Sequence, residues 1–194
     1  YKTYMLLYFS KKYREKDIVM QLHFGCLRNN NSLISAPDTG YDSINNYAPA
    51  DKMVKLIDHM NLNGLPKTIL YSLNPNDDEL IDTIIGCFQN DDCVGKIQHG
   101  SAWWFNDNKT GMLKQMNSLA NGGLLGNFVG MLTDSRSFIS YPRHEYFRRI
   151  MCNYIGSLVE NGEYPYDEDN LKEIVEGISY NNALKYFGFD KEIK

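Results

Sequence analysis

The chain has 194 residues, of which 43% are hydrophobic and 23% are charged, and its formal net charge is -4. This length allows one domain with a sizeable core, and the composition excludes a disordered chain. A mildly acidic protein has no electrostatic reason to bind nucleic acid or an anionic membrane, so we expect neither as a partner.

The cysteines and the apolar runs bear on where the protein works. None of the four cysteines belongs to a C-x-x-C pair, which predicts a reduced, intracellular and specifically cytoplasmic protein. The longest uncharged run, 115–133, contains asparagines and glycines, so we expect no membrane span. The chain starts without methionine in an amphipathic segment that lacks a signal-peptide cleavage site. We therefore expect a fragment or a processed product.

Four short apolar segments, each partly β-branched or aromatic, predict buried strands. They cover 17–25, 67–73, 95–104 and 127–135. Amphipathic patterns alternate with them and predict helices over 51–64, 74–88, 109–123 and 142–162, with one or two more in the tail 167–189. This alternation is typical of βα units around a parallel sheet, and no linker divides the chain. A long polar stretch, 28–50, predicts a functional loop.

Polar side chains stand at the carboxyl ends of the predicted strands, which is the edge where parallel α/β proteins bind ligands. His23 ends the first segment and Asp134 ends the fourth. A histidine and an aspartate on different strands of one sheet favour a metal site. Each also has an ordinary interpretation, His23 as a core histidine and Asp134 as half of a structural ion pair.

Two arginines and two tryptophans accompany these residues. Arg28 and Arg136 follow strand ends and could form surface ion pairs, but beside a metal site they favour an anionic substrate. Trp103 and Trp104 are adjacent and face opposite sides of a strand, so one can pack in the core while the other forms a pocket wall for a sugar. The sequence has no phosphate-binding loop, nucleophile elbow or zinc cysteine pair, which leaves metal-assisted or acid–base chemistry.

Five motifs resemble, in chain order, those of uronate isomerase (glucuronate isomerase), a family of the amidohydrolase superfamily. They are "MQLHFGCLRNNN", "PKTILYSLNP", "GKIQHGSAWWFND", "FVGMLTDSRSF" and "YPRHEYFRRIMCN", and the resemblance runs from about residue 1 to residue 187. It implies an α/β fold that is the C-terminal half, strands five to eight with their helices, of a metal-dependent (β/α)8 TIM barrel. Residues 1–194 would then be the C-terminal portion of a single barrel domain.

The resemblance also implies a reaction and a set of roles. The reaction is the aldose–ketose isomerisation of hexuronates, D-glucuronate to D-fructuronate and D-galacturonate to D-tagaturonate, by metal-assisted proton transfer between C2 and C1. Asp134 would be a metal ligand and proton shuttle, and His23 would lie beside the metal. Arg136, Arg28, Trp103 and Trp104 would hold the uronate. A divalent metal ion, first of all zinc, is the expected cofactor. The sequence leaves open the metal, the preferred uronate and the catalytic base.

One departure from the family pattern concerns the metal. The family's first strand supplies a His-x-His pair, and this sequence contains none. We therefore expect the missing N-terminal half of the barrel to be a partner of this chain, and the chain alone to be inactive. Two alternatives stay open, another metal-dependent hydrolase of the superfamily and a catalytically incomplete sugar-acid binding fragment. A homo-oligomer is also compatible with the sequence.

Overall fold

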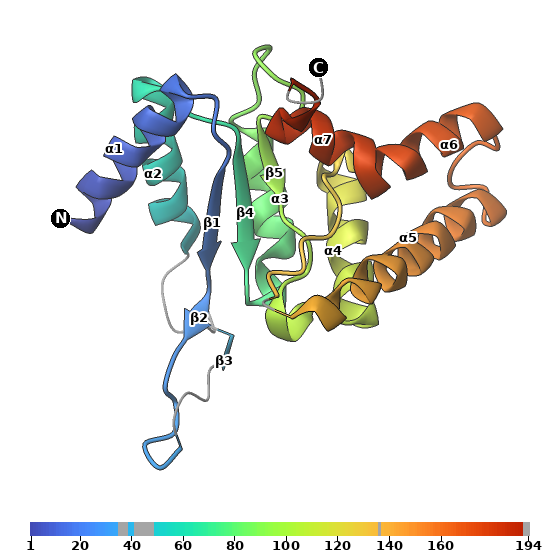
Figure 1. Ribbon diagram of the computed structural model, residues 1–194, viewed down its shortest axis with the longest axis horizontal. Helices are drawn as coiled ribbons and strands as arrows, with labels where there is room; N and C mark the ends of the chain where they lie inside the picture. The colour runs from blue at the N-terminus through green and yellow to red at the C-terminus, as the bar shows by residue number, and fades with distance from the viewer. Residues whose placement is uncertain (35–38, 41–48, 136, 192–194) are drawn as a thin grey trace.

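The computed structural model describes residues 1–34, 39–40, 49–135 and 137–191, in which helices and strands alternate along the chain (Figure 1). The α-helices in these residues are α1 (Lys2–Glu15), α2 (Pro49–Asn63), α3 (Asp78–Gly86), α4 (Lys109–Gly122), α5 (Pro142–Glu160), α6 (Glu168–Glu176) and α7 (Asn182–Phe187). The strands in them are β1 (Met20–Phe24), β2 (Cys26–Leu27), β3 (Thr39–Gly40), β4 (Thr68–Ser72) and β5 (Ile97–His99). The predicted helices are confirmed to within a few residues at their ends.

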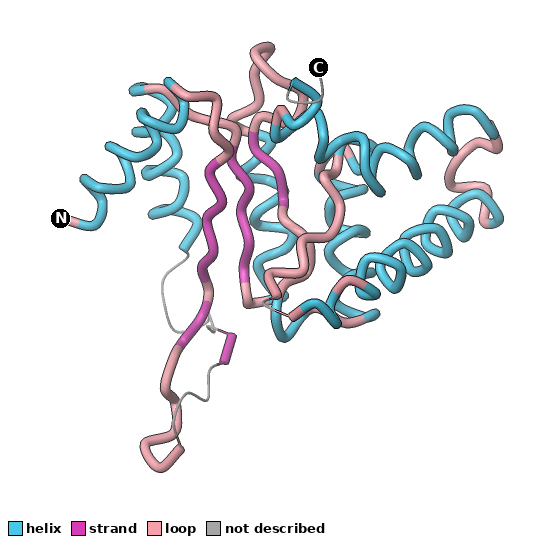
Figure 2. Tube along the Cα trace, in the orientation of Figure 1, coloured by secondary structure: helices cyan, strands magenta, loops and turns pink. Residues whose placement is uncertain are grey.

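Strands β1, β4 and β5 form a parallel sheet in the order β1-β4-β5, which confirms the predicted α/β class (Figure 2). Every residue of the central strand β4 is buried, as expected for a parallel strand covered on both faces. In β1 the pattern alternates, because Gln21 and His23 are exposed while Met20 is buried. Side chains alternate between the two faces of a strand. One face of β1 therefore packs on the protein, and the other is open.

The helices pack on one another in chain order, from α1 on α2 to α4 on α5. Figure 1 shows α1 and α2 beside β1, α3 behind the sheet, and α4 behind the extended segment on the other side of β5. The side chain of Asn108 accepts a hydrogen bond of 3.1 Å from the amide of Gly111 and starts α4. Asn74 accepts one of 3.1 Å from the amide of Asn76, in the turn before α3. Such caps satisfy amides that a first helical turn leaves unpaired, so short sequence signals fix where α4 and the 3-10 turn Pro75–Asp77 begin.

The predicted fourth strand, 127–135, was wrong. The structure describes all nine of these residues and assigns none of them to a strand. Two backbone conformations explain the difference, because Gly130 has a φ of 77° and Asp134 has a φ of 46°. A regular strand requires negative φ throughout. The segment is extended only in part and cannot form a continuous ladder with β5.

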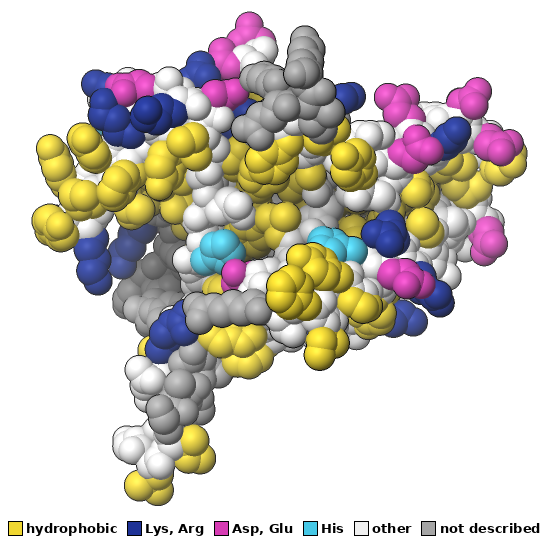
Figure 3. Space-filling model, viewed as in Figure 1, with side chains coloured by type: hydrophobic (Ala, Val, Ile, Leu, Met, Phe, Trp, Pro, Cys, Tyr) yellow, Lys and Arg dark blue, Asp and Glu magenta, His cyan; other side chains and the backbone are white. Residues whose placement is uncertain are grey.

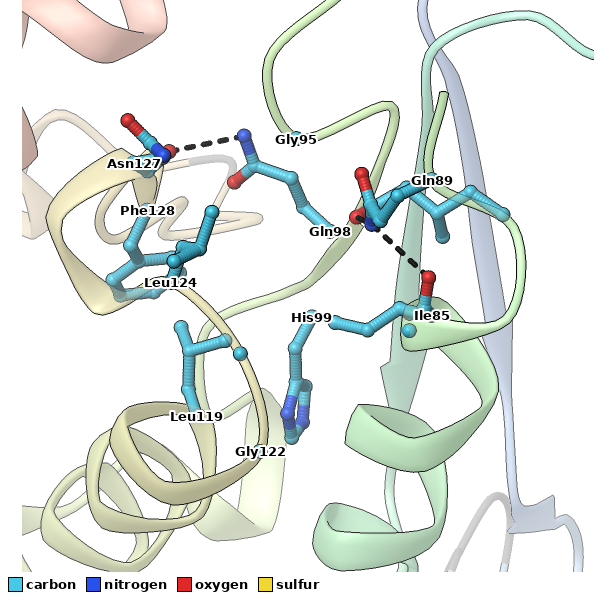
Figure 4. A pocket seen from close by; sticks show the side chains of 13 residues that line it. Ile85, Gln89, Gly95, Gln98, His99, Leu119, Gly122, Leu124, Asn127 and Phe128 are labelled. Atoms are coloured by element: carbon cyan, nitrogen blue, oxygen red, sulfur yellow. Dashed lines mark hydrogen bonds between the residues drawn. The ribbon is translucent and has the colours of Figure 1, made fainter. Parts of the chain in front are cut away.

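Side chains take the place of that ladder. The Nε2 group of Gln98, in β5, donates a hydrogen bond of 3.1 Å to the carbonyl of Asn127 (Figure 4). The Oε1 atom of Gln98 accepts a second one, of 3.1 Å, from the amide of Val129. Further along, the amide of Leu132 donates to Oγ of Ser101 at 3.3 Å. Buried backbone groups must find partners, so these contacts hold the segment beside β5 without making it a strand.

The other strands are shorter than predicted, and one pairing was not foreseen. β1 starts only at Met20, after Asp17, whose φ of 52° interrupts the extended backbone. β2 and β3 pair in an antiparallel register that joins Cys26 to Gly40. Most of the predicted functional loop, 28–50, and the predicted substrate-binding residue Arg136 lie outside the described residues. Within the described ranges, every helix is too short or too polar to cross a membrane.

Candidate active site at the carboxyl ends of the strands

Aromatic rings surround His23 at the carboxyl end of β1. His23 pairs in register with Tyr71 of β4, and the two rings stack with centroids 4.3 Å apart and planes 4° apart. The ring of Trp103 meets the His23 ring edge-on, with centroids 4.7 Å apart. Three elements therefore meet at this point, namely the ends of β1 and β4 and the loop that follows β5.

Asp134 reaches the same place from the extended segment. The Nε1 group of Trp103 donates a hydrogen bond of 3.0 Å to Oδ2 of Asp134. Both Asp134 and Trp104 have left-handed backbone conformations, with φ of 46° and 53°. Side chains other than glycine adopt this region at a cost, and such strain is frequent at functional sites. The structure thus brings His23, Trp103 and Asp134 together from three separate parts of the sequence.

Tyr71 is a site residue that the sequence analysis missed. Its hydroxyl donates a hydrogen bond of 3.0 Å to Oε1 of Gln21, which lies on the same face of β1 as His23. A Cβ atom at Gly100 would overlap the Tyr71 ring, so the glycine leaves room for it. Burial, and then the charge of Asp134, raise the pKa of Tyr71 far above its usual value. The tyrosine therefore stays neutral and acts here as a rigid support for His23.

The electrostatic environment of His23 favours its neutral form. Partial burial lowers the pKa of His23, and the nearby charge of Asp134 opposes the shift without reversing it. Figure 3 shows this face, with a histidine and an acidic side chain adjacent near its centre. A neutral imidazole and a carboxylate are both good donors for a divalent metal ion.

These two donors do not complete a metal centre. The described ranges of the chain contain no group of three or more His, Cys, Asp or Glu side chains that could hold a metal ion. A catalytic zinc site typically has about three protein ligands and water. His23 and Asp134 fit a metal site as two of its ligands, and any third protein ligand must come from elsewhere.

The predicted substrate-binding residues flank this centre. The guanidinium of Arg28 lies 5.2 Å from the ring centroid of Trp104, a distance typical of cation–π contact. Trp104 is partly exposed and Trp103 is buried. The sequence analysis expected one tryptophan inside and one at a pocket wall, and the two side chains have those different exposures.

His99, which the sequence places in the middle of the third predicted strand, lies apart from this centre. It pairs in register with Leu70, the neighbour of Tyr71, so its side chain faces the helices. Its Nδ1 atom lies 2.9 Å from Oδ1 of Asp82, and its Nε2 atom lies 3.5 Å from Oδ1 of Asp78. Burial alone would lower the pKa of His99, but the hydrogen bonds and charges of Asp78 and Asp82 outweigh burial and raise it. A cavity of about 280 Å³ adjoins His99 on this side (Figure 4).

Comparison with known proteins identifies relatives of this chain. Residues 1–187 match the family model described as glucuronate isomerase. The uronate isomerase of Endomicrobium trichonymphae is 58% identical over 193 residues, which are 97% of this chain and 41% of that protein. That of Lachnospira eligens is 59% identical over 194 residues, 98% of this chain and 42% of that protein. The chain therefore spans about two fifths of the length of these curated relatives. The resemblance found in the sequence is confirmed.

Solved structures share the fold. The glucuronate isomerase of Caulobacter crescentus matches with a TM-score of 0.78 at 22% identity, over 96% of this chain and 38% of that one. A uronate isomerase of Bacillus halodurans matches with a TM-score of 0.64 at 14% identity, over 94% of this chain and 40% of that one. At these identities the likeness concerns the fold alone.

Proposed function

We propose that this chain, which belongs to the glucuronate isomerase family, is part of an enzyme that isomerises hexuronates between their aldose and ketose forms. The substrates would be D-glucuronate, converted to D-fructuronate, and D-galacturonate, converted to D-tagaturonate. The observation that carries the proposal is the meeting of His23, Trp103 and Asp134 at the carboxyl ends of a parallel sheet. Parallel α/β proteins bind ligands at this edge.

Asp134 is the residue that we assign to proton transfer. Its Oδ2 atom accepts the hydrogen bond from the indole of Trp103, which restricts the orientation of the carboxylate. Moving a proton between C2 and C1 of the open-chain sugar requires a group that accepts it and returns it. Such general acid–base catalysis typically contributes about 10²–10⁴-fold in rate.

His23 and Asp134 would hold a divalent metal ion, with zinc as the first candidate. When bound, such an ion polarises the carbonyl and hydroxyl oxygens of the sugar. The stacked ring of Tyr71 restricts the orientation of the His23 imidazole, and partial burial keeps it neutral. A neutral, fixed imidazole presents its lone pair in one direction, which a metal ligand must do.

The substrate carboxylate would bind to arginine beside the tryptophans. Arg28 lies over the partly exposed ring of Trp104, so a sugar packed against the edge of that ring would have a guanidinium close to its carboxylate. Guanidinium groups match carboxylates with two parallel hydrogen bonds. We assign the same role to Arg136, which follows Asp134 by two positions in the sequence.

We further propose that residues 1–194 are the C-terminal portion of one (β/α)8 barrel domain. Three parallel strands and one extended segment, each followed by a helix, fit four of its eight units. The other strands, and with them the missing metal ligands, would come from the part of the polypeptide that the longer relatives contain and this chain lacks.

The test is the rate of turnover by the complete protein, meaning the longer polypeptide of which we propose this chain is a part, and by one variant of it. Asp134→Asn should lower kcat for the conversion of D-glucuronate to D-fructuronate by about 10²–10⁴-fold, with the circular dichroism spectrum unchanged. Asp58→Asn, at an exposed position on α2, is the matched control and should keep full turnover. Full turnover by Asp134→Asn would contradict the role of Asp134. If the unaltered protein bound D-glucuronate tightly but did not convert it, the proposed function would be sugar-acid binding and not catalysis.

A further inference from the structure

The loop between β5 and α4 carries both tryptophans and is held at several points. We call residues 103–108 the Trp loop. At its start, Trp103 bonds to Asp134. Near its middle, the Nδ2 group of Asn106 donates a hydrogen bond of 3.0 Å to the carbonyl of Leu73, just after β4. Towards its end, Asp107 forms an ion pair with Arg143, in the first turn of α5. Figure 1 shows the start of α5 beside the turn that precedes α4.

The Asp107–Arg143 pair differs from an ordinary surface ion pair. The Asp107 side chain is only 8% exposed and the Arg143 side chain is 40% exposed. The Nη2 group of Arg143 pairs with Oδ2 of Asp107 and also donates a hydrogen bond of 3.1 Å to its backbone carbonyl. Within the described part of the chain, the buried atoms Nε of Arg143 and Oδ1 of Asp107 have no hydrogen-bond partner. Nε of Arg143 and Oδ1 of Asp107 are the atoms that a second, parallel hydrogen bond between these two groups would join.

The pair closes a ring of contacts around the carboxylate of the site. Arg143 follows Asp134 by nine positions in the sequence and pairs with Asp107. Asp107 belongs to the Trp loop, whose first residue, Trp103, bonds to Asp134 and closes the ring. Two members of this ring, Asp134 and Trp104, have φ of 46° and 53°. Strained backbone conformations persist only where surrounding contacts hold them.

We propose that Asp107 and Arg143 are positioning residues, which fix the Trp loop to the start of α5 and so keep Trp103 in place to orient Asp134. The catalytic part of this proposal rests on the proposed function, whereas its structural part does not. Neither residue needs to touch the substrate. The polypeptide outside this chain is not required for the contacts, because all of them join described residues.

The chain offers a matched control on the same helix. Arg149 bonds to Glu145 with its Nη2 and Oε1 atoms 2.6 Å apart, and these side chains are 78% and 58% exposed. Exposed pairs of this kind contribute little to stability. Arg149→Gln removes the same group as Arg143→Gln, from the same helix, without touching the Trp loop.

The experiment uses the complete protein labelled with 5-fluorotryptophan and observed by ¹⁹F NMR. The resonances of Trp103 and Trp104 are assigned from Trp→Phe variants. Arg143→Gln should shift or broaden the Trp103 resonance and lower kcat by about 10- to 100-fold, the scale expected from misplacing a catalytic group by about 1 Å. Arg149→Gln should change neither. Arg143→Lys should recover only part of kcat, because an ammonium cannot reproduce the planar fork.

Two further variants keep the proposal falsifiable if Arg143→Gln fails to fold. Removing Arg143 alone leaves a buried carboxylate unpaired, whereas Asp107→Asn and the double variant do not. The double variant should therefore fold at least as well as Arg143→Gln and still show the displaced Trp103 resonance. An unchanged resonance and an unchanged kcat in the double variant would overturn the proposal. A displaced resonance in a protein that shows no isomerase activity even when unaltered would support the positioning and refute the proposed function.

Discussion

Trp103 donates its indole hydrogen to Oδ2 of Asp134 over 3.0 Å, and the same ring meets His23 edge-on with centroids 4.7 Å apart. One aromatic side chain thus contacts both of the residues to which we assign the metal. Its two contacts are chemically different, because the first needs the indole N–H and the second needs only a ring.

This difference leads to the first prediction. Trp103→Phe in the complete protein keeps a ring beside His23 but removes the N–H, so the Asp134 carboxylate loses a partner. Hydrogen bonds to charged groups contribute about 1.5–3 kcal/mol. We expect kcat to fall by about 10- to 100-fold, in proportion to that energy, with the melting temperature nearly retained. Steady-state kinetics provide the measurement.

Trp104→Phe is the comparison for this prediction. Among the described residues the hydrogen bond to Asp134 comes from Trp103. Trp104 lies under the Arg28 guanidinium instead, with 5.2 Å between its ring centroid and the cation. Its replacement should raise KM for D-glucuronate more than it lowers kcat. If both variants lowered kcat alike with KM unchanged, the indole hydrogen bond would not be what orients Asp134.

The sequence predicted the helices well because their ends depend on local contacts. Asn108 starts α4 by bonding to an amide three residues ahead, and Pro142 stands in the first turn of α5. Such signals lie within a few residues of the feature they determine. The placement of His23 near the end of a strand was also visible, since it requires only that the residue lie at the end of an apolar segment.

The sequence could not predict features that depend on distant partners. The segment 127–135 has the composition of a strand, but the side chain of Gln98 binds its backbone and Gly130 interrupts it. Tyr71 joins the site because the register of β4 sets it beside His23. No local pattern encodes a register between strands that are about fifty residues apart.

The second prediction concerns the buried histidine behind the sheet. The carboxylates of Asp78 and Asp82 face His99 from α3, and the Oγ–H group of Ser118 donates to Asp82 from α4. The two carboxylates raise the pKa of His99 above its usual value of 6.5 despite burial. A raised pKa means that protonated His99 stabilises the folded state. This contribution to the free energy of unfolding is fully present below pH 6.5 and is lost as the pH rises through the raised pKa.

Urea unfolding at a series of pH values tests this. The free energy of unfolding of the complete protein should decline as the pH rises above 6.5, and Asp78→Asn should reduce the decline. His59→Gln, at an exposed position on α2, should leave it unchanged. A decline of the same size in Asp78→Asn would contradict the contribution of Asp78 to the raised pKa of His99.

The third prediction compares two glycines. A Cβ atom at Gly122, at the end of α4, would lie 2.7 Å from Cβ of Asp82 on α3, whereas one at Gly156 in α5 would meet nothing within 4 Å. Gly122→Ala should force the two helices apart and destabilise the protein by about 1–3 kcal/mol. Gly156→Ala should stabilise it by about 0.5–1 kcal/mol, because alanine is the better helix former. Thermal unfolding of both variants decides, and equal effects would mean that α3 and α4 do not pack this closely.

The last prediction concerns the chain on its own. β1 has β4 on one side, and on its other side the described residues supply no strand. Beside it, α1 exposes the aromatic side chains of Tyr4, Tyr8 and Phe9. An open strand edge next to an apolar surface favours pairing with another chain. We expect the isolated chain to self-associate in sedimentation velocity. We also expect it to show no conversion of D-glucuronate, because we assign only two metal ligands to its described residues.

Adding the separately produced N-terminal polypeptide should reverse both properties, since it would pair with the edge of β1, cover α1 and bring the missing ligands. Replacing Tyr4 and Phe9 by serine should weaken self-association and also weaken this recovery, because both depend on the same surface. The same replacement at exposed Tyr166, far along the sequence, should affect neither. The measurements are the sedimentation coefficient, the metal content and the rate of D-fructuronate formation for each half and for the mixture. Robust turnover by the isolated chain would show that two ligands on an open sheet are enough, and would contradict the account of the metal site given above.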